Sequence, residues 1–249
     1  MIRKLTIPGA AGAISALLQR PAGAVPCPLV ILMHGFMANK TLEPLKSLAD
    51  SLEAAGIASL RFDFDGHGRS AGKFVDTTVL TELEDARRVF AYARKLDFVT
   101  EIALAGHSQG GVVAGMLAGE LKEQVKALVL LAPAAVLRDD ACNGVLMGRT
   151  YDPAHPPKRL FVLFHYVGQA YIRVAQTLPI YETSARYPGP VCLIHGKNDK
   201  IVPYSYSEKY QAIFADCELH LLEGENHLLS RKRPEVIAAA VSFLQMHLR

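Results

Sequence analysis

Several features that define particular protein classes are missing from this sequence. The longest strongly apolar run spans about ten residues, 128–137, and is interrupted by Pro133, whereas a membrane-spanning helix needs about 20. The longest basic run is the triplet at 231–233, and Lys plus Arg exceed Asp plus Glu by only 27 − 24 = 3. Nucleic-acid-binding domains usually carry a stronger basic patch. We therefore expect neither a membrane span nor a nucleic-acid partner.

Cysteine is scarce, and no two cysteines form a Cys-x-x-Cys pair. Cys27 and Cys192 lie in strand-like runs, which favours buried, reduced thiols over a disulfide framework. The Ala- and Gly-rich stretch 9–16 follows two basic residues but is too short for the apolar core of a signal peptide. The expected location is the cytoplasm.

The nine histidines show neither a His-x-x-x-His nor a His-Glu-x-x-His spacing, so we expect no catalytic metal. The Gly-rich loop 63–70, which contains His67, is similar to a phosphate cradle. It lacks the Lys-Ser/Thr ending that a nucleotide-binding loop requires. We interpret it as a structural loop beneath a site formed by other segments.

Strand-like and helix-like segments alternate along most of the chain. Apolar runs and alternations predict eight strands, at 3–7, 14–19, 28–33, 58–62, 102–105, 127–131, 191–194 and 218–222. Apolar residues at spacings of three and four predict helices between most of these strands, and a last helix that starts at Pro234. This order predicts a single α/β domain over residues 1–249, with a mostly parallel eight-stranded sheet and helices on both faces.

The alternation stops at residues 133–187, which show no clean period. This stretch holds 7 of the 19 aromatic residues (10 Phe plus 9 Tyr). We predict an inserted lid over the active site. Its aromatic side chains are suited to a flat apolar pocket for a planar aromatic group, but composition alone favours their packing into a small core within the insertion itself.

A nucleophile is predicted at Ser108. The sequence Gly106-His107-Ser108-Gln109-Gly110 matches Gly-x-Ser-x-Gly, the motif of a sharp strand-to-helix turn whose outer positions must be small. It follows the strand-like run EIALA and opens a helix rich in Ala, Gly and Val. That context is the one in which the motif exposes a reactive serine.

A serine hydroxyl needs a neighbouring base, and in this fold the chain order is Ser, acid, His. Asp199 follows one predicted strand, and His227 follows the next strand, 28 residues further on. Both therefore lie at the sheet edge where Ser108 must lie. We predict His227 as the base and Asp199 as the acid. Rival residues are less suited to these roles. His220 lies inside a predicted strand, and His247 lies near the chain end. Glu223 and Glu225 are too close to His227 in the sequence, and Asp216 precedes its strand and should lie at the opposite edge of the sheet.

Two backbone N–H groups should form an oxyanion hole. One belongs to Gln109, the residue after the predicted nucleophile. The other should come from the loop 34–37 after the strand at 28–33. Gly35 lets that loop turn close to the substrate, and Phe36 is the predicted N–H donor.

Taken together, these motifs resemble the α/β-hydrolase superfamily along nearly the whole chain. Other segments are similar to bacterial feruloyl (cinnamoyl) esterases. The segments that carry the two resemblances are HGF at 34–36, FDFDGHGRS at 62–70, GHSQGG at 106–111, LAPAAVLRDDA at 131–141, AQTLPIYE at 175–182, CLIHGKND at 192–199 and LHLLEGENH at 219–227.

The resemblance implies a cofactor-free hydrolase of esters between hydroxycinnamic acids and plant sugars or quinate. It implies the same triad and oxyanion hole, and an insertion that covers the acyl pocket. In the family an acid and a tyrosine of this insertion reach the distal phenolic hydroxyl of the substrate. The matching positions are Asp140 and Tyr171, although Asp139 adds a second acid and leaves open which of the two points inward.

The same sequence features fit other functions. A monoacylglycerol lipase, a short-chain esterase or a serine aminopeptidase would use the same chemistry, and a non-catalytic hydrolase-like binding protein is a different class. A dehalogenase is excluded because it needs a carboxylate where Ser108 stands. We expect a small-molecule ester as the partner, and the sequence leaves a homodimer open.

Overall fold

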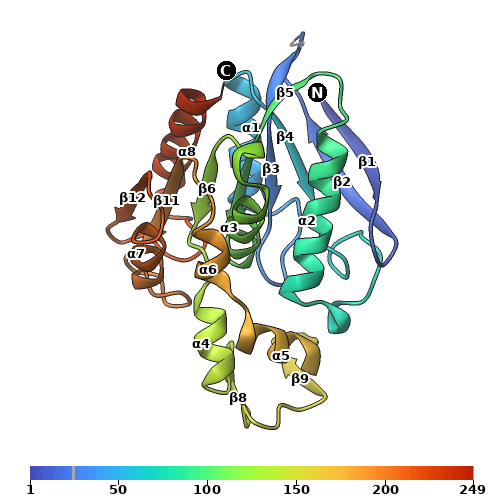
Figure 1. The fold of residues 1–249 in the computed structure, drawn as a ribbon, viewed down its shortest axis with the longest axis vertical. Helices are drawn as coiled ribbons and strands as arrows, with labels where there is room; N and C mark the ends of the chain where they lie inside the picture. Colours follow the sequence, from blue (N-terminus) through green and yellow to red (C-terminus); the bar gives the residue numbers. More distant parts are fainter. Residues whose placement is uncertain (24–25, 249) are drawn as a thin grey trace.

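The computed structural model describes residues 1–23 and 26–248, and eight of its strands form one sheet (Figure 1). The spatial order is β1-β2-β4-β3-β5-β6-β11-β12. β1 and β2 are antiparallel to their neighbours, and the pairs from β4 to β12 are parallel. The bounds are β1 Ile2–Pro8, β2 Ala13–Gln19, β3 Cys27–Met33, β4 Ala58–Phe62, β5 Val99–His107, β6 Leu128–Leu131, β11 Val191–Gly196 and β12 Cys217–Leu222.

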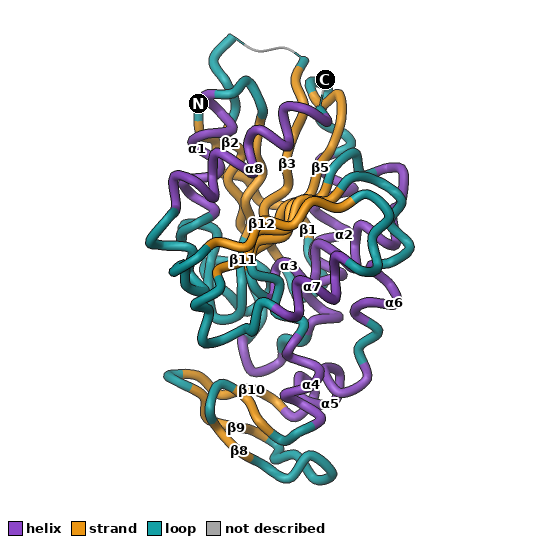
Figure 2. The backbone as a smooth tube through the Cα atoms, turned by 90° about the vertical axis from the view of Figure 1, so that its left-hand side faces the viewer, coloured by secondary structure: helices purple, strands orange, loops and turns teal. Residues whose placement is uncertain are grey.

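Helices cover both faces of this sheet (Figure 2). α1 (Leu45–Ala54) and α8 (Arg233–His247) pack on one face, and α2 (Val79–Ala93), α3 (Gln109–Leu121) and α7 (Ser205–Gln211) pack on the other. The mostly parallel α/β architecture predicted from the sequence is confirmed. No helix in the described part of the chain is long and apolar enough to span a membrane.

Apolar side chains on both faces explain why the central strands read as continuous apolar runs. In β3, Leu29 and Ile31 belong to the core beneath α2 and α3, whereas Val30 and Leu32 belong to the core beneath α1 and α8. All four side chains are fully buried. A strand buried on both faces needs no polar alternation.

The chain between β6 and β11 contains the insert, which we define as residues 133–187. Its elements are short: α4 Val136–Cys142, β7 Val145–Leu146, β8 Arg149–Thr150, β9 Arg159–Val162, β10 His165–Gly168, α5 Gln169–Thr177 and α6 Ile180–Ser184. Most of the insert lies beyond one end of the sheet (Figure 1). β10 packs against the short helix η1 (Phe74–Asp76), which anchors the insert to the main body.

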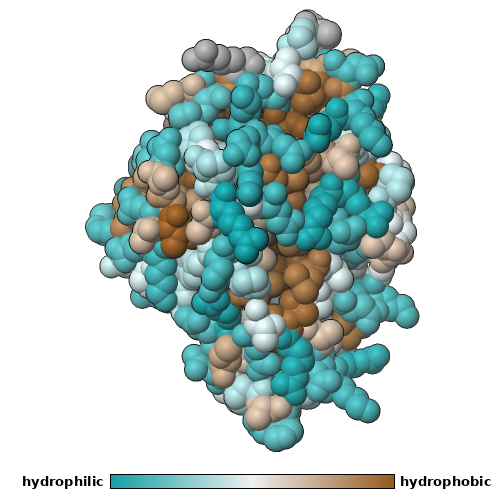
Figure 3. All heavy atoms as spheres, viewed as in Figure 1, coloured by the Kyte–Doolittle hydropathy of each residue, from teal (hydrophilic) through white to brown (hydrophobic). Residues whose placement is uncertain are grey.

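The helix α6 connects the insert back to the sheet and packs closely on α3. The side of the molecule in Figure 3 is mostly hydrophilic, with hydrophobic residues gathered where the insert meets the helices of the main body. Two glycines of α3 allow the close approach. A Cβ at Gly119 would lie 1.9 Å from the carbonyl oxygen of Thr183, and one at Gly115 would lie 3.0 Å from the Ser184 hydroxyl.

We expect Gly119→Ala to destabilise the protein by about 1–3 kcal/mol, because a backbone carbonyl cannot move aside as a side chain can. The higher helix propensity of alanine offsets this by up to about 1 kcal/mol. Gly115→Ala is the matched control and should be nearly neutral, since the Ser184 side chain can rotate. Urea unfolding would measure both. Equal stabilities of Gly119→Ala and wild type would contradict the close α3–α6 packing.

Candidate active site

Ser108 lies between β5 and α3, in a backbone conformation that side chains rarely adopt. Its φ is 57° and its ψ is −122°. A Cβ at Gly106 would lie 2.1 Å from the carbonyl oxygen of Gly110, and a Cβ at Gly110 would lie 2.3 Å from the carbonyl oxygen of Met33. Only glycine fits at both positions, so the two outer residues of the motif are required by the tightness of the turn.

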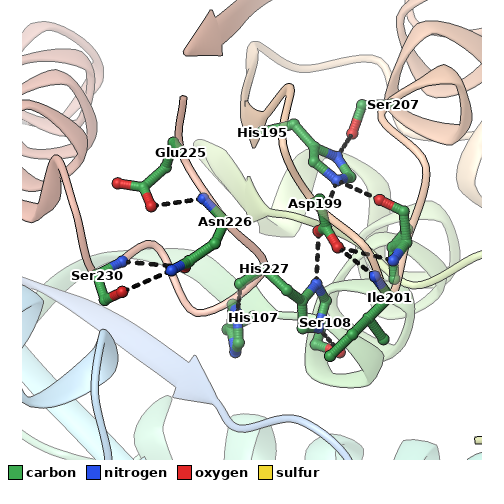
Figure 4. Close-up of polar contacts among 11 residues, drawn as sticks. His107, Ser108, His195, Asp199, Ile201, Ser207, Glu225, Asn226, His227 and Ser230 are labelled. Carbon is green, nitrogen blue, oxygen red and sulfur yellow. Dashed lines mark hydrogen bonds and ion pairs between the residues drawn. The ribbon is translucent and has the colours of Figure 1, made fainter. Parts of the chain in front are cut away.

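The structure brings Ser108, His227 and Asp199 together, although they are far apart in the chain (Figure 4). Ser108 Oγ lies 2.9 Å from His227 Nε2, and His227 Nδ1 lies 2.6 Å from Asp199 Oδ2. Each residue is less than a tenth exposed. With Nδ1–H donating to the carboxylate, Nε2 is free to accept the serine proton.

Asp199 is held as a carboxylate by several donors. The backbone N–H groups of Ile201 and Val202 both donate to Oδ1 at 2.8 Å. Burial disfavours the charge, but the hydrogen bonds from His195, His227 and Val202 outweigh it and hold the pKa of Asp199 well below its usual range. The acid therefore stays ionised throughout the neutral range.

His195, which no sequence motif marks, contacts the predicted acid Asp199 directly. Its Nε2 lies 3.0 Å from both Asp199 Oδ2 and the Val202 carbonyl oxygen (Figure 4). Both partners can only accept, so Nε2 carries a proton, and in the neutral ring Nδ1 accepts from the Ser207 hydroxyl at 2.7 Å. The position of His195, four residues before Asp199 in HGKND, was the available signal.

Two further buried residues fix the loop that carries His227. His107 Nε2 donates to the carbonyl oxygen of His227 at 2.8 Å, and burial lowers the pKa of His107 to about 4, so its ring is neutral. Glu225 is fully buried and accepts from the backbone N–H groups of Asn226, Arg231 and Lys232. Glu225, rejected above as the catalytic acid, is a loop-forming residue.

The two predicted oxyanion donors both line a cavity beside Ser108. Gln109 is the first residue of α3, where backbone N–H groups lack partners within the helix and the helix dipole favours negative charge. Phe36 lies in the loop after β3. A Cβ at Gly35 would lie 2.9 Å from the Cβ of Ser108, so glycine brings this loop against the serine.

The Gly-rich loop 63–70 lies next to the loop 34–37, which carries Phe36. The backbone N–H of Phe64 donates to His34 Nε2 at 3.2 Å. Asp63 pairs with the ammonium group of Lys40 and accepts from the backbone N–H of Arg69. These contacts are internal to the protein and fit a structural role for the loop.

The cavity has a volume of about 260 Å³ and is walled by both the main body and the insert. Asp140 lines it, whereas the Asp139 carboxylate accepts from the Tyr206 hydroxyl at 2.6 Å, toward α7. The structure therefore selects Asp140 as the acid at the cavity. The other lining residues are Phe36, Ser108, Gln109, Ala134, Val136, Leu137, Val145, Leu146, Met147, Gly148, Tyr171, Lys200, Ile201 and Val202.

Tyr171 also lines the cavity, and its hydroxyl hydrogen is already engaged. It donates to Gln109 Oε1 at 2.6 Å. The tyrosine ring packs against that of Phe36, with the ring centroids 5.3 Å apart. A phenolic hydroxyl has one hydrogen and can accept as well, so toward a ligand Tyr171 is available as an acceptor.

Comparison with known proteins agrees with this geometry. Residues 24–170 match the family described as serine aminopeptidase, S33. Est1E from Butyrivibrio proteoclasticus, in a structure with bound ferulic acid, is 34% identical, with a TM-score of 0.95 over 98% of each chain. A monoacylglycerol lipase from Mycolicibacterium smegmatis is 25% identical over 78% of each chain.

Human Protein ABHD12B is 28% identical over 189 residues, and the match spans only 49% of that longer protein. The family match covers more than half of this chain, and the likeness to Est1E covers nearly all of it. The chain therefore belongs to the serine aminopeptidase S33 family of α/β hydrolases.

Proposed function

We propose that the protein is a serine carboxylesterase that hydrolyses hydroxycinnamate esters through an acyl-enzyme. The observation that carries the proposal is the hydrogen-bonded series Ser108–His227–Asp199, which opens into a cavity lined by Asp140 and Tyr171. The ferulic acid bound to the similar Est1E structure supports the choice of acyl group.

The reaction follows from the hydrogen bonds. Ser108 Oγ attacks the ester carbonyl carbon as its proton passes to His227 Nε2, and Asp199 stabilises the resulting imidazolium. The N–H groups of Phe36 and Gln109 stabilise the oxyanion. His227 then protonates the leaving alcohol, activates a water molecule that attacks the acyl-enzyme, and returns the proton to Ser108 as the acid leaves.

The insert supplies the specificity in this proposal and acts as a lid over the acyl pocket. Leu137, Asp140, Leu146 and Tyr171 all reach the cavity from the insert. Apolar walls suit a planar aromatic acyl group. The Asp140 carboxylate and the Tyr171 oxygen are the acceptors for its phenolic O–H.

A second candidate is a monoacylglycerol lipase or short-chain esterase. It is favoured by the similarity to the mycobacterial monoacylglycerol lipase and by the apolar side chains that make up most of the cavity wall. Kinetics on methyl ferulate, methyl p-coumarate, a monoacylglycerol and p-nitrophenyl butyrate separate the two. A preference of a hundredfold or more in kcat/KM for the butyrate ester over methyl ferulate would favour the second candidate.

Ser108→Ala should lower kcat by about four to six orders of magnitude, because the triad acts as one unit. Labelling by a serine-reactive fluorophosphonate should be lost as well. Ser242→Ala, at an exposed position on α8, is the control and should leave both readouts unchanged. A folded Ser108→Ala protein that keeps more than a tenth of wild-type activity would refute the assignment of the nucleophile.

Asp199→Asn should lower kcat by about 10⁴, since an amide NH₂ cannot accept from the histidine and the imidazole takes the wrong tautomer. Asp199 also accepts from two backbone N–H groups through Oδ1, so the amide should orient its oxygen toward them and its NH₂ toward the histidines. Asp216→Asn, at an exposed position, is the control. A nearly silent Asp199→Asn would show that another acid serves the base.

Asp140→Ala should lower kcat/KM for methyl ferulate by roughly tenfold to a hundredfold, because a buried phenolic hydroxyl loses its acceptor. Turnover of p-nitrophenyl butyrate should change by less than about twofold, because its transition state makes no contact there. The neighbouring Asp139→Ala is the matched control, since Asp139 pairs with Tyr206. Equal losses on both esters would assign Asp140 a structural role.

A further inference from the structure

A buried carboxyl group lies behind the oxyanion hole and is not used by the triad. Glu82, in the first turn of α2, is only 1% exposed. Its Oε2 accepts from Gln109 Nε2 at 2.8 Å, and Gln109 Oε1 in turn accepts from the Tyr171 hydroxyl at 2.6 Å. This series, Glu82–Gln109–Tyr171, links α2, the start of α3 and the insert helix α5.

The series fixes both residues that supply the oxyanion donors. The Gln109 amide is bonded at both ends, so its side chain cannot rotate without breaking a buried hydrogen bond. The Tyr171 ring packs on Phe36, which packs in turn on Phe74, with ring centroids 5.3 and 5.4 Å apart. Glu82 therefore supports the backbone N–H of Gln109 by holding the Gln109 side chain. It supports the loop that carries Phe36 through Tyr171, which packs on the Phe36 ring.

The structure shows no cation beside Glu82 among the described residues. Gln109 from α3 and Tyr171 from α5 face it as neutral groups, and the other acidic group that faces it is Asp85 on α2 itself. Burial raises the pKa of Glu82 to about 8, the hydrogen bond from Gln109 opposes this, and Asp85 adds to it. Burial likewise raises the pKa of Asp85 to about 7.

We propose that Glu82 is a positioning residue of the esterase, which holds Gln109 for oxyanion binding while it is neutral and suppresses turnover when it ionises. The inference rests on the proposed serine esterase chemistry but not on the choice of a hydroxycinnamate substrate. Only Gln109 lies between the Glu82 carboxyl group and the proposed position of the oxyanion. A negative charge on Glu82 would therefore repel the negative charge that develops in the transition state. Inside a buried site this repulsion is only weakly screened.

The sign of the pH dependence follows from the group that titrates. Below about pH 8 Glu82 is protonated and the oxyanion hole is intact, so kcat is high; as the pH rises through this range, kcat should fall by roughly tenfold or more.

Glu82→Gln is the decisive variant, because it keeps an acceptor oxygen for Gln109 and cannot ionise. We measure kcat and KM for p-nitrophenyl butyrate from pH 6 to 10, with activity after return to pH 7 as the check on reversibility. The expected result is near-wild-type kcat at pH 7 and no alkaline limb. Glu84→Gln, on the same helix with its carboxylate paired to exposed arginines, should keep the limb.

Two further variants test the hydrogen bond from Gln109 to Glu82 and the influence of the neighbouring Asp85 on the ionisation of Glu82. Glu82→Leu leaves Gln109 Nε2 buried without an acceptor and should lower kcat by roughly tenfold to a hundredfold at every pH, with KM little changed. Asp85→Asn removes a neighbouring negative charge, which makes Glu82 easier to ionise, so the alkaline limb should move to lower pH.

An alkaline limb that is identical in Glu82→Gln and wild type would overturn the proposal, whether or not Glu82→Leu folds. Loss of the limb together with normal activity at pH 7 supports it. Failure of the proposed function would look different. Activity that survives Ser108→Ala removes the serine mechanism, and poor turnover of methyl ferulate removes only the substrate choice and leaves the pH test valid.

Discussion

A serine with φ of 57° can face a substrate only if the surrounding backbone leaves room for the turn that carries it. Three glycines provide that room: Gly106 and Gly110 within the turn, and Gly35 in the facing loop. The same close approach places the loop after β3 and the start of α3 on the two sides of Ser108. In the proposed esterase the nucleophile and the oxyanion hole thus depend on one steric constraint.

The site is held by buried polar contacts rather than by surface loops alone. Asp199 is bonded to two histidines and two backbone N–H groups, His227 is held through its own carbonyl by His107, and Gln109 is bonded to Glu82 and Tyr171. A buried polar group left without a partner is destabilising. Each contact therefore restricts these side chains to one arrangement, which is the preorganisation that the proposed acyl transfer requires.

The sequence predicts the main body well because its signals are strong. The central strands are apolar on both faces, and the motif around Ser108 follows from sterics alone. Chain order and strand ends suffice to bring Asp199 and His227 to the serine. The elements of the insert have no detectable period because many are only two to five residues long, too short for helical or strand periodicity to repeat.

Glu82 and His195 were not predicted from the sequence for a different reason. Glu82 looks like an ordinary polar residue near a helix start, and His195 looks like one residue of a buried strand. Their role depends on partners 27 and 4 residues away in the chain. No local sequence pattern indicates the contact between Glu82 and Gln109. The four-residue spacing between His195 and Asp199 is visible in the sequence, but it does not by itself indicate that the two side chains are in contact. Asp139 and Asp140 are neighbours in α4 that point in different directions, Asp139 to the Tyr206 hydroxyl and Asp140 to the cavity, and only the folded helix decides which one lines the cavity.

The engagement of Tyr171 also bears on which acyl groups the cavity would accept. Its single hydroxyl hydrogen is donated to Gln109, and Asp140 as a carboxylate can only accept. In the proposed esterase both polar groups from the insert therefore demand a hydrogen-bond donor from the substrate. A free phenolic hydroxyl supplies one, and a methyl ether at the same position does not. In this proposal the hydrogen bond that positions the oxyanion hole also sets the polarity of the acyl pocket, so that catalysis and substrate choice are coupled through Gln109.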